Sequence, residues 1–467
     1  MSDIKFGTDG WRAIIAKEFT VNNVARITQA TASWLLDNYE NPSVVIGHDC
    51  RFAGPLFAET AVKVLAHNKI KVFMAHKVAS TPMVSLANVK LNASAGIVLT
   101  ASHNPPSYHG FKLKGSYGGP LLPDDIAKVE AHLPKTNEID LDAIEMDELK
   151  ASGLLEIVDL EQMYVDQVTA NFDLDLINNS GLKLGYDAMY GAGQDVMKRL
   201  LPGIDFLHCD HNPSFMGQAP EPILKNLQEF SELVKNSDIQ SGLATDGDAD
   251  RLGMIDTDGT FVDSHHLILL LIHYLCKYKG EKGKVCTAFS TTVKIKNMCE
   301  HYGLELEVVP IGFKHICEIM INEDILIGGE ESGGIAIKGH IPERDGIWMG
   351  LIIWEFMAKS GKTLRELIDE VYEIVGTFAF ERSDLHIKEQ QKLDIIEKCK
   401  SGAYESFGSY KVERLDDLDG FKYFFNDNEW FMIRASGTEP VLRTYAESDS
   451  RENALKILKA GYDTLLN

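Results

Sequence analysis

The stretch "SVVIGHDCRFAGPLFAETAVKVLAHNKIKVFMAH", residues 43–76, contains two short apolar runs on either side of a longer amphipathic segment. Residues 43–49 and 70–76 have the length and composition of strands, whereas apolar residues recur three and four apart across residues 54–68. Strand, helix and strand in this order are typical of a parallel sheet, because the helix carries the chain back to begin the next strand in the same direction. The stretch therefore predicts an α/β layer.

The same alternation returns twice, at residues 182–201 and 284–312, whereas beyond residue 375 the apolar residues alternate as in antiparallel strands. A chain of 467 residues is too long for one ordinary core. We therefore predict an α/β protein with three similar α/β domains, each with a mixed, mostly parallel sheet, and a C-terminal α+β domain. The expected domains are residues 1–156, 157–259, 260–375 and 376–467.

The overall composition and charge indicate which partners and which cellular location to expect. The net charge of −23 repels nucleic acid and anionic membranes, so neither is an expected partner, and a phosphate site must gather its own positive charge. The N-terminus lacks the pattern of a signal peptide, and no uncharged apolar run is long enough to span a bilayer. Seven scattered cysteines without a CxxC motif are typical of reduced thiols. A cytoplasmic location is expected.

The strongest local signal is "ATDGDADRLG", residues 244–253, in which Asp246, Asp248 and Asp250 alternate with small residues. Alternation in an extended loop can bring three carboxylates to one point, and hard oxygen ligands suit Mg²⁺. An EF-hand-like calcium loop is disfavoured, because the twelfth position is Thr257 instead of a glutamate. A solvated acidic turn is the simpler alternative.

A second signal is "TASHNP", residues 100–105, which follows the apolar run "AGIVL". A polar turn would explain these letters. A serine at a strand end beside a metal loop can instead carry a phosphoryl group, which makes Ser102 a candidate nucleophile. Lys112 is then a candidate proton shuttle, and His103 and His109 are each as easily structural imidazoles as chemical groups.

Three further loops contain groups suited to sugars and phosphates. In "RASGTEPVLR", residues 434–443, hydroxyls, backbone N–H groups and two arginines could surround an anion, although a hairpin turn would also fit. In "GGEESGG", residues 328–334, paired glutamates could accept hydrogen bonds from sugar hydroxyls, although a flexible acidic turn would also fit. Near the N-terminus, in "FGTDGWR", Thr8 and Arg12 could reach a phosphate; an exposed Asp-Gly turn is the alternative.

"TASHNP", "DGDADR", "GEESG" and "RASGTEP", in this order, resemble the phosphoserine, metal, sugar and phosphate loops of the α-D-phosphohexomutase family. The resemblance covers the whole chain and implies four domains around a central active-site cleft, each contributing one loop. It implies an isomerase in which a phosphoserine converts a hexose 1-phosphate into a 1,6-bisphosphate and takes back the other phosphate. Bound Mg²⁺ and the hexose 1,6-bisphosphate, as intermediate and activator, are the implied cofactors.

The resemblance also implies roles for individual residues. The implied metal ligands are Ser102, Asp246, Asp248 and Asp250. The implied catalytic groups are Ser102, Lys112, His103, Arg12 and Arg251. The expected substrate-binding residues are Thr8, Lys314, Glu330, Ser332 and Arg344, and the expected phosphate-binding residues are Arg434, Ser436, Gly437, Thr438 and Arg443.

The sugar loop "GEESG" is similar to that of glucose-preferring members, which carry glutamate at the position of Glu331. The expected reaction is therefore the interconversion of glucose 1-phosphate and glucose 6-phosphate. A phosphomannomutase or dual-specificity mutase, and less favourably a metal-dependent sugar phosphatase, are the alternatives. Many members have histidine where this chain has Gly334, and His340 or Arg344 could supply the missing contact. The expected partners are small hexose phosphates, and the expected state is a monomer or weak homodimer.

Overall fold

The structure, a computed structural model, describes residues 4–435 and 441–466, and the chain divides into two compact units. The first unit runs to Ser264 and takes in Gly312–Leu367, and the second contains His265–Ile311 and the chain from Ile368 onward. The expected segment 260–375 is therefore divided between the two units. None of the described helices is long and apolar enough to cross a membrane.

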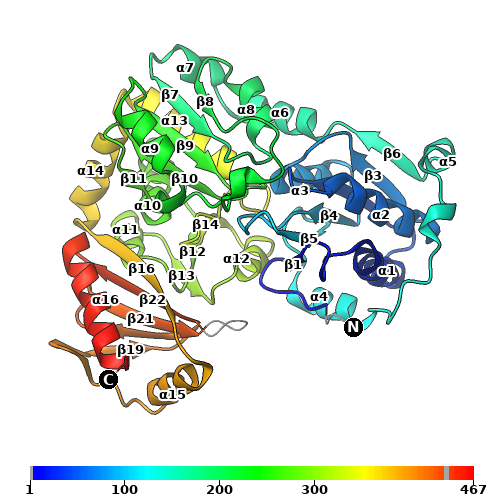
Figure 1. Cartoon of the computed structure of the whole chain (residues 1–467). Helices are drawn as coiled ribbons and strands as arrows, with labels where there is room; N and C mark the ends of the chain where they lie inside the picture. The colour runs from blue at the N-terminus through cyan, green and yellow to red at the C-terminus, as the bar shows by residue number, and fades with distance from the viewer. Residues whose placement is uncertain (1–3, 436–440, 467) are drawn as a thin grey trace. The chain divides into compact units, whose positions relative to one another are not determined.

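The first unit begins with a six-stranded sheet in the order β1-β5-β4-β2-β3-β6, drawn in blue and cyan in Figure 1. Strands β4, β2, β3 and β6 are parallel, and β5 is antiparallel to both of its neighbours, β4 and β1. The strands are β1 (Trp11–Ile14), β2 (Ser43–His48), β3 (Lys71–Ala75), β4 (Ala95–Leu99), β5 (Tyr108–Gly115) and β6 (Leu155–Val158). The expected domain boundary after residue 156 falls inside β6, which pairs with β3, so the first sheet continues to Val158.

Helices accompany these strands as the alternation predicts. Thr20 caps the N-terminus of α1, with its side chain accepting a hydrogen bond from Asn23 N, and Ser80 caps α3 in the same way, accepting from Met83 N. The helices are α1 (Val21–Asn38), α2 (Gly54–His67), α3 (Thr81–Lys90), α4 (Pro123–Ala131) and α5 (Met146–Ala151), with a short 3₁₀ turn at Leu141–Ala143. The run of residues 43–76 therefore forms β2, α2 and β3, which confirms the predicted α/β layer.

A second mixed sheet has the order β11-β10-β9-β7-β8, in which β9, β7 and β8 are parallel. Its strands are β7 (Leu184–Asp187), β8 (Asp205–Leu207), β9 (Ser241–Thr245), β10 (Leu252–Asp256) and β11 (Phe261–Val262). Its helical segments are α6 (Leu160–Asn171), α7 (Leu174–Asn179), α8 (Gln194–Leu200), α9 (Gln228–Lys235) and 3₁₀ turns at Phe215–Gly217 and Leu224–Asn226. The expected boundary after residue 259 precedes β11, which still pairs with β10.

Packing explains why the segment 312–367 belongs to the first unit. Helix α13 (Gly346–Ser360) lies against the second sheet: a Cβ on Gly350 would lie 2.3 Å from Leu243 Cδ2, and Trp354 Nε1 donates to Ser241 Oγ at 3.2 Å. The same segment contains α12 (Phe313–Met320) and the antiparallel pair β14 (Ile325–Gly329) and β15 (Ile335–Ile337). Helix α14 (Leu364–Val375) begins in this segment and ends in the second unit.

The second unit contains a parallel pair and an antiparallel sheet with the order β16-β22-β21-β20-β19. The pair is β12 (Lys284–Ala288) and β13 (Leu306–Val309), accompanied by α11 (Lys294–Tyr302) and by α10 (Ser264–His273), which continues as a π-helix at Tyr274–Tyr278. The sheet strands are β16 (Ala379–His386), β19 (Arg414–Asp416), β20 (Phe421–Phe424), β21 (Trp430–Ala435) and β22 (Val441–Ser448). A small hairpin, β17 (Ser406–Phe407) and β18 (Tyr410–Lys411), and helices α15 (Glu389–Lys400) and α16 (Arg451–Leu466) complete the C-terminal part (Figure 1).

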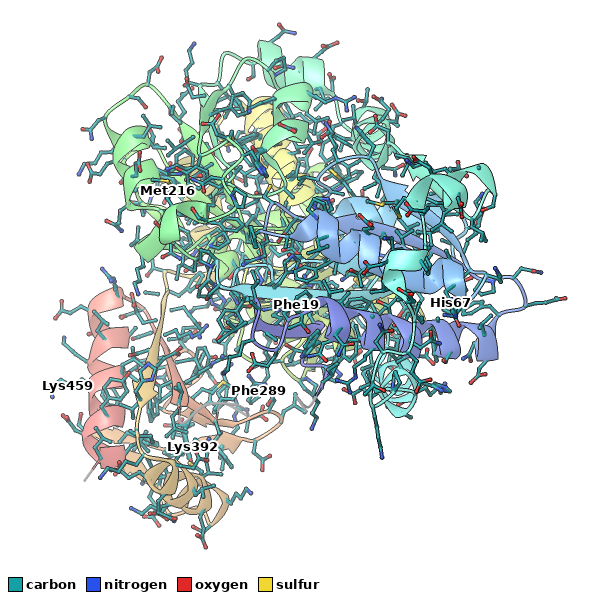
Figure 2. The ribbon with its side chains drawn as sticks, turned by 45° about the vertical axis from the view of Figure 1, so that its right-hand side comes forward. Phe19, His67, Met216, Phe289, Lys392 and Lys459 are labelled. Atoms are coloured by element: carbon teal, nitrogen blue, oxygen red, sulfur yellow. The ribbon has the colours of Figure 1, made fainter. Side chains whose placement is uncertain are left out.

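Aromatic packing in the first unit decides between the two interpretations of His109. The ring of His109 stacks on Phe19 at 4.8 Å and meets Phe57 edge-on at 5.1 Å, and Figure 2 labels Phe19 in this part of the chain. Burial lowers the pKa of His109 to about 3, so the imidazole is neutral. His109 is therefore a core residue of the first sheet.

Candidate active site

Ser102 stands just beyond the end of β4, in a turn whose backbone is held in an unusual conformation. Its φ of 51° lies in the left-handed region, which is uncommon for a residue other than glycine and costs free energy. The hydroxyl Oγ donates a hydrogen bond to Asp246 Oδ2 at 2.6 Å and lies 3.2 Å from His103 Nδ1. The structure thus brings together Ser102 and the acidic loop, which are 144 residues apart in the sequence.

The acidic loop connects β9 to β10 and contains Asp246, Asp248 and Asp250, all fully buried. One oxygen from each carboxylate lies within 4.8 Å of the others. Ala249 has a φ of 57°, so this loop also contains a left-handed residue other than glycine. A Cβ on Gly247 would lie 2.6 Å from Ser102 O, so glycine is required where the serine and acidic loops meet.

Some oxygens of these carboxylates accept hydrogen bonds, and others have no hydrogen-bond partner among the described residues. Asp246 accepts from Ser102 Oγ and Arg251 N, and Asp248 Oδ2 accepts from Thr81 Oγ1 at 2.5 Å. Asp248 Oδ1 and Asp250 Oδ1 are buried and have no hydrogen-bond partner among the described residues. Buried unpaired oxygens are costly unless a cation or water satisfies them, so this donor set could hold a divalent metal ion.

The pKa values of the aspartates reflect the short distances between the three carboxylates. Burial, together with the charges of Asp248 and Asp250, raises the pKa of Asp246 well above its usual range. Burial would also raise the pKa of Asp248, but the ammonium of Lys112 and hydrogen bonds outweigh it and hold that pKa below its ordinary value. The loop therefore carries negative charge that a nearby cation stabilises.

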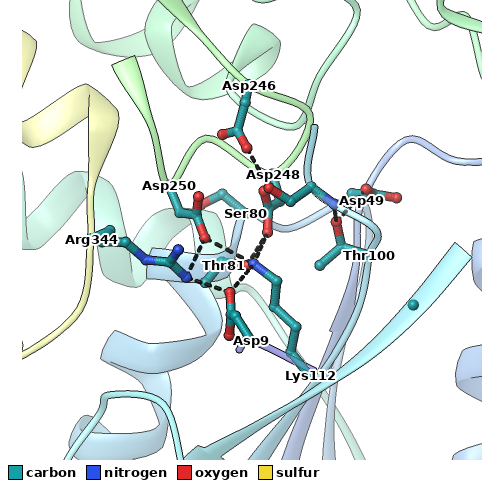
Figure 3. Close-up of polar contacts among 12 residues, drawn as sticks. Asp9, Asp49, Ser80, Thr81, Thr100, Lys112, Asp246, Asp248, Asp250 and Arg344 are labelled. Atoms are coloured by element: carbon teal, nitrogen blue, oxygen red, sulfur yellow. Dashed lines mark hydrogen bonds and ion pairs between the residues drawn. The ribbon is translucent and has the colours of Figure 1, made fainter. Parts of the chain in front are cut away.

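Lys112, on β5, is the centre of an ion-pair network (Figure 3). Its Nζ lies 2.7 Å from Asp248 Oδ2, 2.8 Å from Asp250 Oδ2 and 2.8 Å from Asp9 Oδ2. Burial opposes the ammonium charge, but the three carboxylates outweigh it and raise the pKa of Lys112 well above its usual range. Lys112 is therefore held as a cation beside the acidic loop.

Arg344 joins the other side of this network. Its Nη2 binds Asp250 Oδ2 at 2.8 Å and also contacts Asp9 (Figure 3). Its Nε lies 3.4 Å from Glu343 Oε1. The aliphatic stem of Arg344 lies against Gly334: a Cβ there would be 2.4 Å from Arg344 Cδ and 3.0 Å from Cγ. Arg344 thus occupies the space that a side chain at position 334 would need.

His340 is placed differently. Its ring stacks on Trp348 at 3.7 Å, and its Nε2 lies 2.9 Å from Asp345 Oδ2. Asp345 also caps α13 and accepts from Tyr164 OH. His340 is thus held in the cluster of Trp348 and Asp345, whereas Arg344 packs directly against Gly334.

The remaining candidates of the first unit lie around this network. Arg12 Nη1 donates to Asn104 Oδ1 at 2.7 Å, in the serine loop. Arg251 Nε lies 3.8 Å from Asp250 Oδ1. Thr8 and Lys314 line a cavity of about 140 Å³ together with Asp9.

In the sugar loop, Glu330 is buried and Oε1 accepts from Gly312 N at 3.0 Å. Burial raises the pKa of Glu330 to about 7, against the opposing charges of Arg344 and Arg251. Ser332 is partly exposed beside it. Sugar hydroxyls could therefore reach both an ionisable carboxyl group and a hydroxyl in this loop.

The expected phosphate loop lies in the second unit, and only its flanks are described. Arg434, at the end of β21, and Arg443, on β22, are directly paired across the two strands. Arg434 Nε donates to Asp419 Oδ1 at 3.0 Å. Two like charges at opposite positions repel, which an anion between them would relieve. Ser436, Gly437 and Thr438 lie outside the described residues.

Sequence reasoning missed several residues that hold these groups in place. Asp9 sits within the motif "TDG" and looks like a turn residue, yet it contacts three cations, Lys112, Lys114 and Arg344. Arg51 follows β2 in "HDCR" and looks like a loop arginine, yet its side chain is fully buried. No spacing rule would have found them, because most of their partners are distant in sequence. The missed residues are Asp9, Asp49, Arg51, Thr81, Thr100, Lys114 and Glu343.

Comparison with protein families gives four matches in chain order. They are the phosphoglucomutase/phosphomannomutase α/β/α domains I, II and III and the C-terminal domain of the same family. The matched residues are 3–140, 162–259, 263–375 and 387–462.

Individual proteins agree with this assignment. A phosphoglucomutase/phosphomannomutase of Thermococcus kodakarensis is 30% identical, with 98% of each chain covered, and a Sulfurisphaera tokodaii phosphoglucosamine/phosphogalactosamine mutase is 28% identical, with 95% of each covered. A crystal structure of a Thermus thermophilus protein, provisionally assigned as a phosphomannomutase, is 33% identical over the whole of both chains with a TM-score of 0.88. On this evidence the chain belongs to the α-D-phosphohexomutase family, whose members are isomerases that transfer a phosphoryl group within a sugar phosphate.

Proposed function

We propose that this protein interconverts glucose 1-phosphate and glucose 6-phosphate through a phosphoserine at Ser102. The observation that carries the proposal is the hydrogen bond of 2.6 Å between Ser102 Oγ and Asp246 Oδ2, at the edge of three buried aspartates with two unpaired oxygens. A nucleophile beside a cation site is what phosphoryl transfer requires, because the reaction depends mainly on alignment and charge neutralisation.

We propose Mg²⁺ as the metal. Ser102, Asp246, Asp248 and Asp250 would hold it, since carboxylates and a phosphate oxygen are the ligands that Mg²⁺ prefers. When bound, the ion supplies positive charge to the phosphoryl oxygens during transfer. Thr81 and Lys112 both bind Asp248 Oδ2, and Lys112 also binds Asp250 Oδ2, which leaves Oδ1 of each carboxylate available.

The first transfer moves the phosphoryl group from Ser102 to O6 of glucose 1-phosphate. The P–Oγ bond breaks as the bond from phosphorus to O6 forms, O6 loses its proton and Ser102 Oγ gains one. We assign Lys112 to give a proton to the leaving oxygen, because it is held as a cation beside the acidic loop, with Nζ 2.7 Å from Asp248 Oδ2. We propose His103 as the proton acceptor, because its Nδ1 lies 3.2 Å from Ser102 Oγ and because burial and nearby cations lower its pKa, which keeps the ring neutral.

The second transfer returns the phosphoryl group of position 1 to Ser102 after the glucose 1,6-bisphosphate has turned over in the site. Arg12 and Arg251 would stabilise the reacting phosphate group, and the loop of residues 434–443 would hold the second phosphate group of the sugar. The cross-strand pair of Arg434 and Arg443 supports this assignment, since an anion offsets the repulsion between them.

The sugar is proposed to be glucose, with Thr8, Lys314, Glu330, Ser332 and Arg344 as its contacts. The support is the "GEESG" loop and the position of Arg344 over Gly334. Relatives are named as glucose, mannose, glucosamine or galactosamine mutases. One pocket contact is worth about 1–3 kcal/mol, so an epimer can remain a slower substrate.

We also propose a cytoplasmic location and a monomer or weak homodimer. None of the seven cysteines forms a disulfide in the described part of the chain, and six of them are buried, which is typical of a protein in a reducing compartment.

Phosphorus NMR tests the function. The protein is mixed with Mg²⁺, glucose 1-phosphate and a trace of glucose 1,6-bisphosphate, and parallel samples contain mannose or glucosamine 1-phosphate. We expect glucose 6-phosphate to form with the wild type and with Ser107→Ala, an exposed serine of the same loop, and not with Ser102→Ala. Release of free phosphate would instead indicate a phosphatase. Faster turnover of mannose or glucosamine 1-phosphate would show that this sugar phosphate, and not glucose 1-phosphate, is the preferred substrate.

A further inference from the structure

Arg51 is a fully buried arginine whose five N–H donors all have partners around the serine loop. Nη2 donates to Ser102 O at 2.6 Å and to Asn104 O at 2.7 Å. Nη1 donates to Pro105 O at 2.9 Å and to Tyr108 O at 3.1 Å. The fifth donor, Nε, binds Asp49 Oδ2 at 3.2 Å. One guanidinium therefore binds four backbone carbonyls of the segment 102–108.

A second route connects the same residues to the backbone of Ser102. Asp49 Oδ1 accepts from Arg51 N, and Asp49 Oδ2 accepts from Thr100 Oγ1 at 2.5 Å. Thr100 Oγ1 in turn accepts from Ser102 N at 2.8 Å. Both the N–H and the carbonyl group of Ser102 are thus held by one buried cluster, which consists of Asp49, Arg51 and Thr100.

This cluster is closed by a loop that follows β8. The ring of Phe215 lies 5.0 Å from Cζ of Arg51, and Phe215 itself is buried. Phe215 and Met216 both have φ near 50°, and Met216 is exposed (Figure 2). The strained turn therefore directs Phe215 onto the guanidinium and leaves its neighbour in solvent.

We propose that Arg51 is a positioning residue for phosphoryl transfer, which holds Ser102 in its left-handed conformation so that Oγ faces Asp246. The inference rests on the proposed function of Ser102. Ser102 has a φ of 51°, a conformation that an unconstrained serine rarely adopts. The bond from Arg51 to Ser102 O and the bond from Ser102 N to Thr100 Oγ1 lie on either side of the N–Cα bond about which φ turns, so they are the contacts that can hold it. An arginine that only stabilised the fold would not need contacts directed at the backbone of Ser102.

The chemistry of the side chain explains why arginine is needed. Lysine offers three donors from a single atom, whereas the planar guanidinium directs five donors outward, four of them to backbone carbonyls here. Arg51→Lys keeps the charge but cannot bind all four carbonyls. A displacement of the reacting oxygen by about 1 Å lowers a transfer rate on the order of 100-fold. Because Arg51 contacts none of the proposed sugar-binding residues in the described hydrogen bonds, KM should change little.

The experiment measures one phosphoryl transfer per site. Wild type, Arg51→Lys and Arg26→Lys are each incubated with glucose 1,6-bisphosphate and Mg²⁺, and mass spectrometry measures the fraction of Ser102 that carries phosphate. Quench-flow with glucose 1-phosphate then gives the rate of phosphate loss per phosphorylated Ser102. Arg26 is the matched control, because it is also buried in the first unit but binds Pro134 O and Asn23 instead.

We expect Arg51→Lys to transfer phosphate about 100-fold more slowly per phosphorylated site, with KM within about threefold of the wild type and Arg26→Lys unchanged. An unchanged rate per site would overturn the proposal, even if fewer molecules were folded. If the wild type gains no phosphate on Ser102, the proposed function fails and this inference fails with it. If Arg51→Lys does not fold, Thr100→Val and Thr100→Ser replace it, and the proposal then requires slow transfer by the valine variant and recovery by the serine variant, which keeps the hydroxyl.

Discussion

Replacing Gly334 with alanine tests whether Arg344 occupies the space above the sugar loop. The added Cβ would lie 2.4 Å from Arg344 Cδ, more than 1 Å inside the usual carbon–carbon contact of about 3.5 Å. Arg344 cannot move away freely, because its side chain is only 2% exposed and Nη2 is bound to Asp9 and Asp250. Overpacking of this kind lowers the free energy of unfolding by about 1–3 kcal/mol.

The assay is urea unfolding followed by tryptophan fluorescence. Trp430 is the single tryptophan of the second unit, so Trp430→Phe leaves a signal that comes from the first unit alone. In that background we compare Gly334→Ala with Gly203→Ala. Gly203 has open space around its Cβ position and no positive φ, so its replacement should change the free energy of unfolding by less than about 0.5 kcal/mol.

A double-mutant cycle assigns the effect to Arg344. When Arg344→Ala has emptied the space, Gly334→Ala should add no further loss of stability, which gives a coupling energy of about 1–3 kcal/mol. If Gly334→Ala is as stable as Gly203→Ala, or lowers stability equally with and without Arg344, the proposed contact does not exist. Gly334→His must displace Arg344 as well, and unchanged substrate affinity in this variant would show that no sugar contact is missing.

Three further outcomes are expected. Thr81→Val should weaken Mg²⁺ binding by about 10–100-fold in calorimetric titration, because Thr81 Oγ1 orients Asp248; unchanged affinity would exclude that role. Burial raises the pKa of Glu447 from 4.5 to about 7, so the folded chain keeps a proton that the unfolded chain loses. Stability should therefore fall by up to about 3 kcal/mol between pH 4.5 and 7, and Glu447→Gln should flatten this fall in urea midpoints. Arg443→Ala should raise KM for glucose 1-phosphate about tenfold with a smaller effect on kcat, since one charge-assisted hydrogen bond is worth about 1.5–3 kcal/mol; an unchanged KM would remove this arginine from the phosphate site.

Local periodicity was enough to predict most of the secondary structure. The runs 43–49, 54–68 and 70–76 became β2, α2 and β3, because their apolar spacing matches the geometry of a buried strand and a half-buried helix. The alternating C-terminal runs became antiparallel strands for the same reason. The division into units was not predictable in this way. Helix α13 is apolar on nearly all sides, and periodicity does not say that its partner is the second sheet.

The candidate site was predictable where a motif contains chemical groups and was not predictable where a residue acts through distant partners. Ser102 and Asp246 were proposed from separate loops, and the structure brings them into contact. Arg51 was missed, because four of its five donors bind backbone carbonyls, and a carbonyl leaves no signature in the choice of side chain. The reason for Gly334 likewise depends on the path of Arg344 in space.

The central claim is that Ser102 carries the phosphoryl group between two molecules of sugar phosphate. The most direct measurement incubates the protein with Mg²⁺ and glucose 1,6-bisphosphate, locates the phosphate by peptide mass spectrometry, and then adds glucose 1-phosphate labelled in its carbon atoms. We predict phosphate on Ser102 alone, and its transfer to the labelled sugar to form the 1,6-bisphosphate. Phosphate on another residue, or its loss from Ser102 to water at the same rate with and without the sugar, would contradict the account.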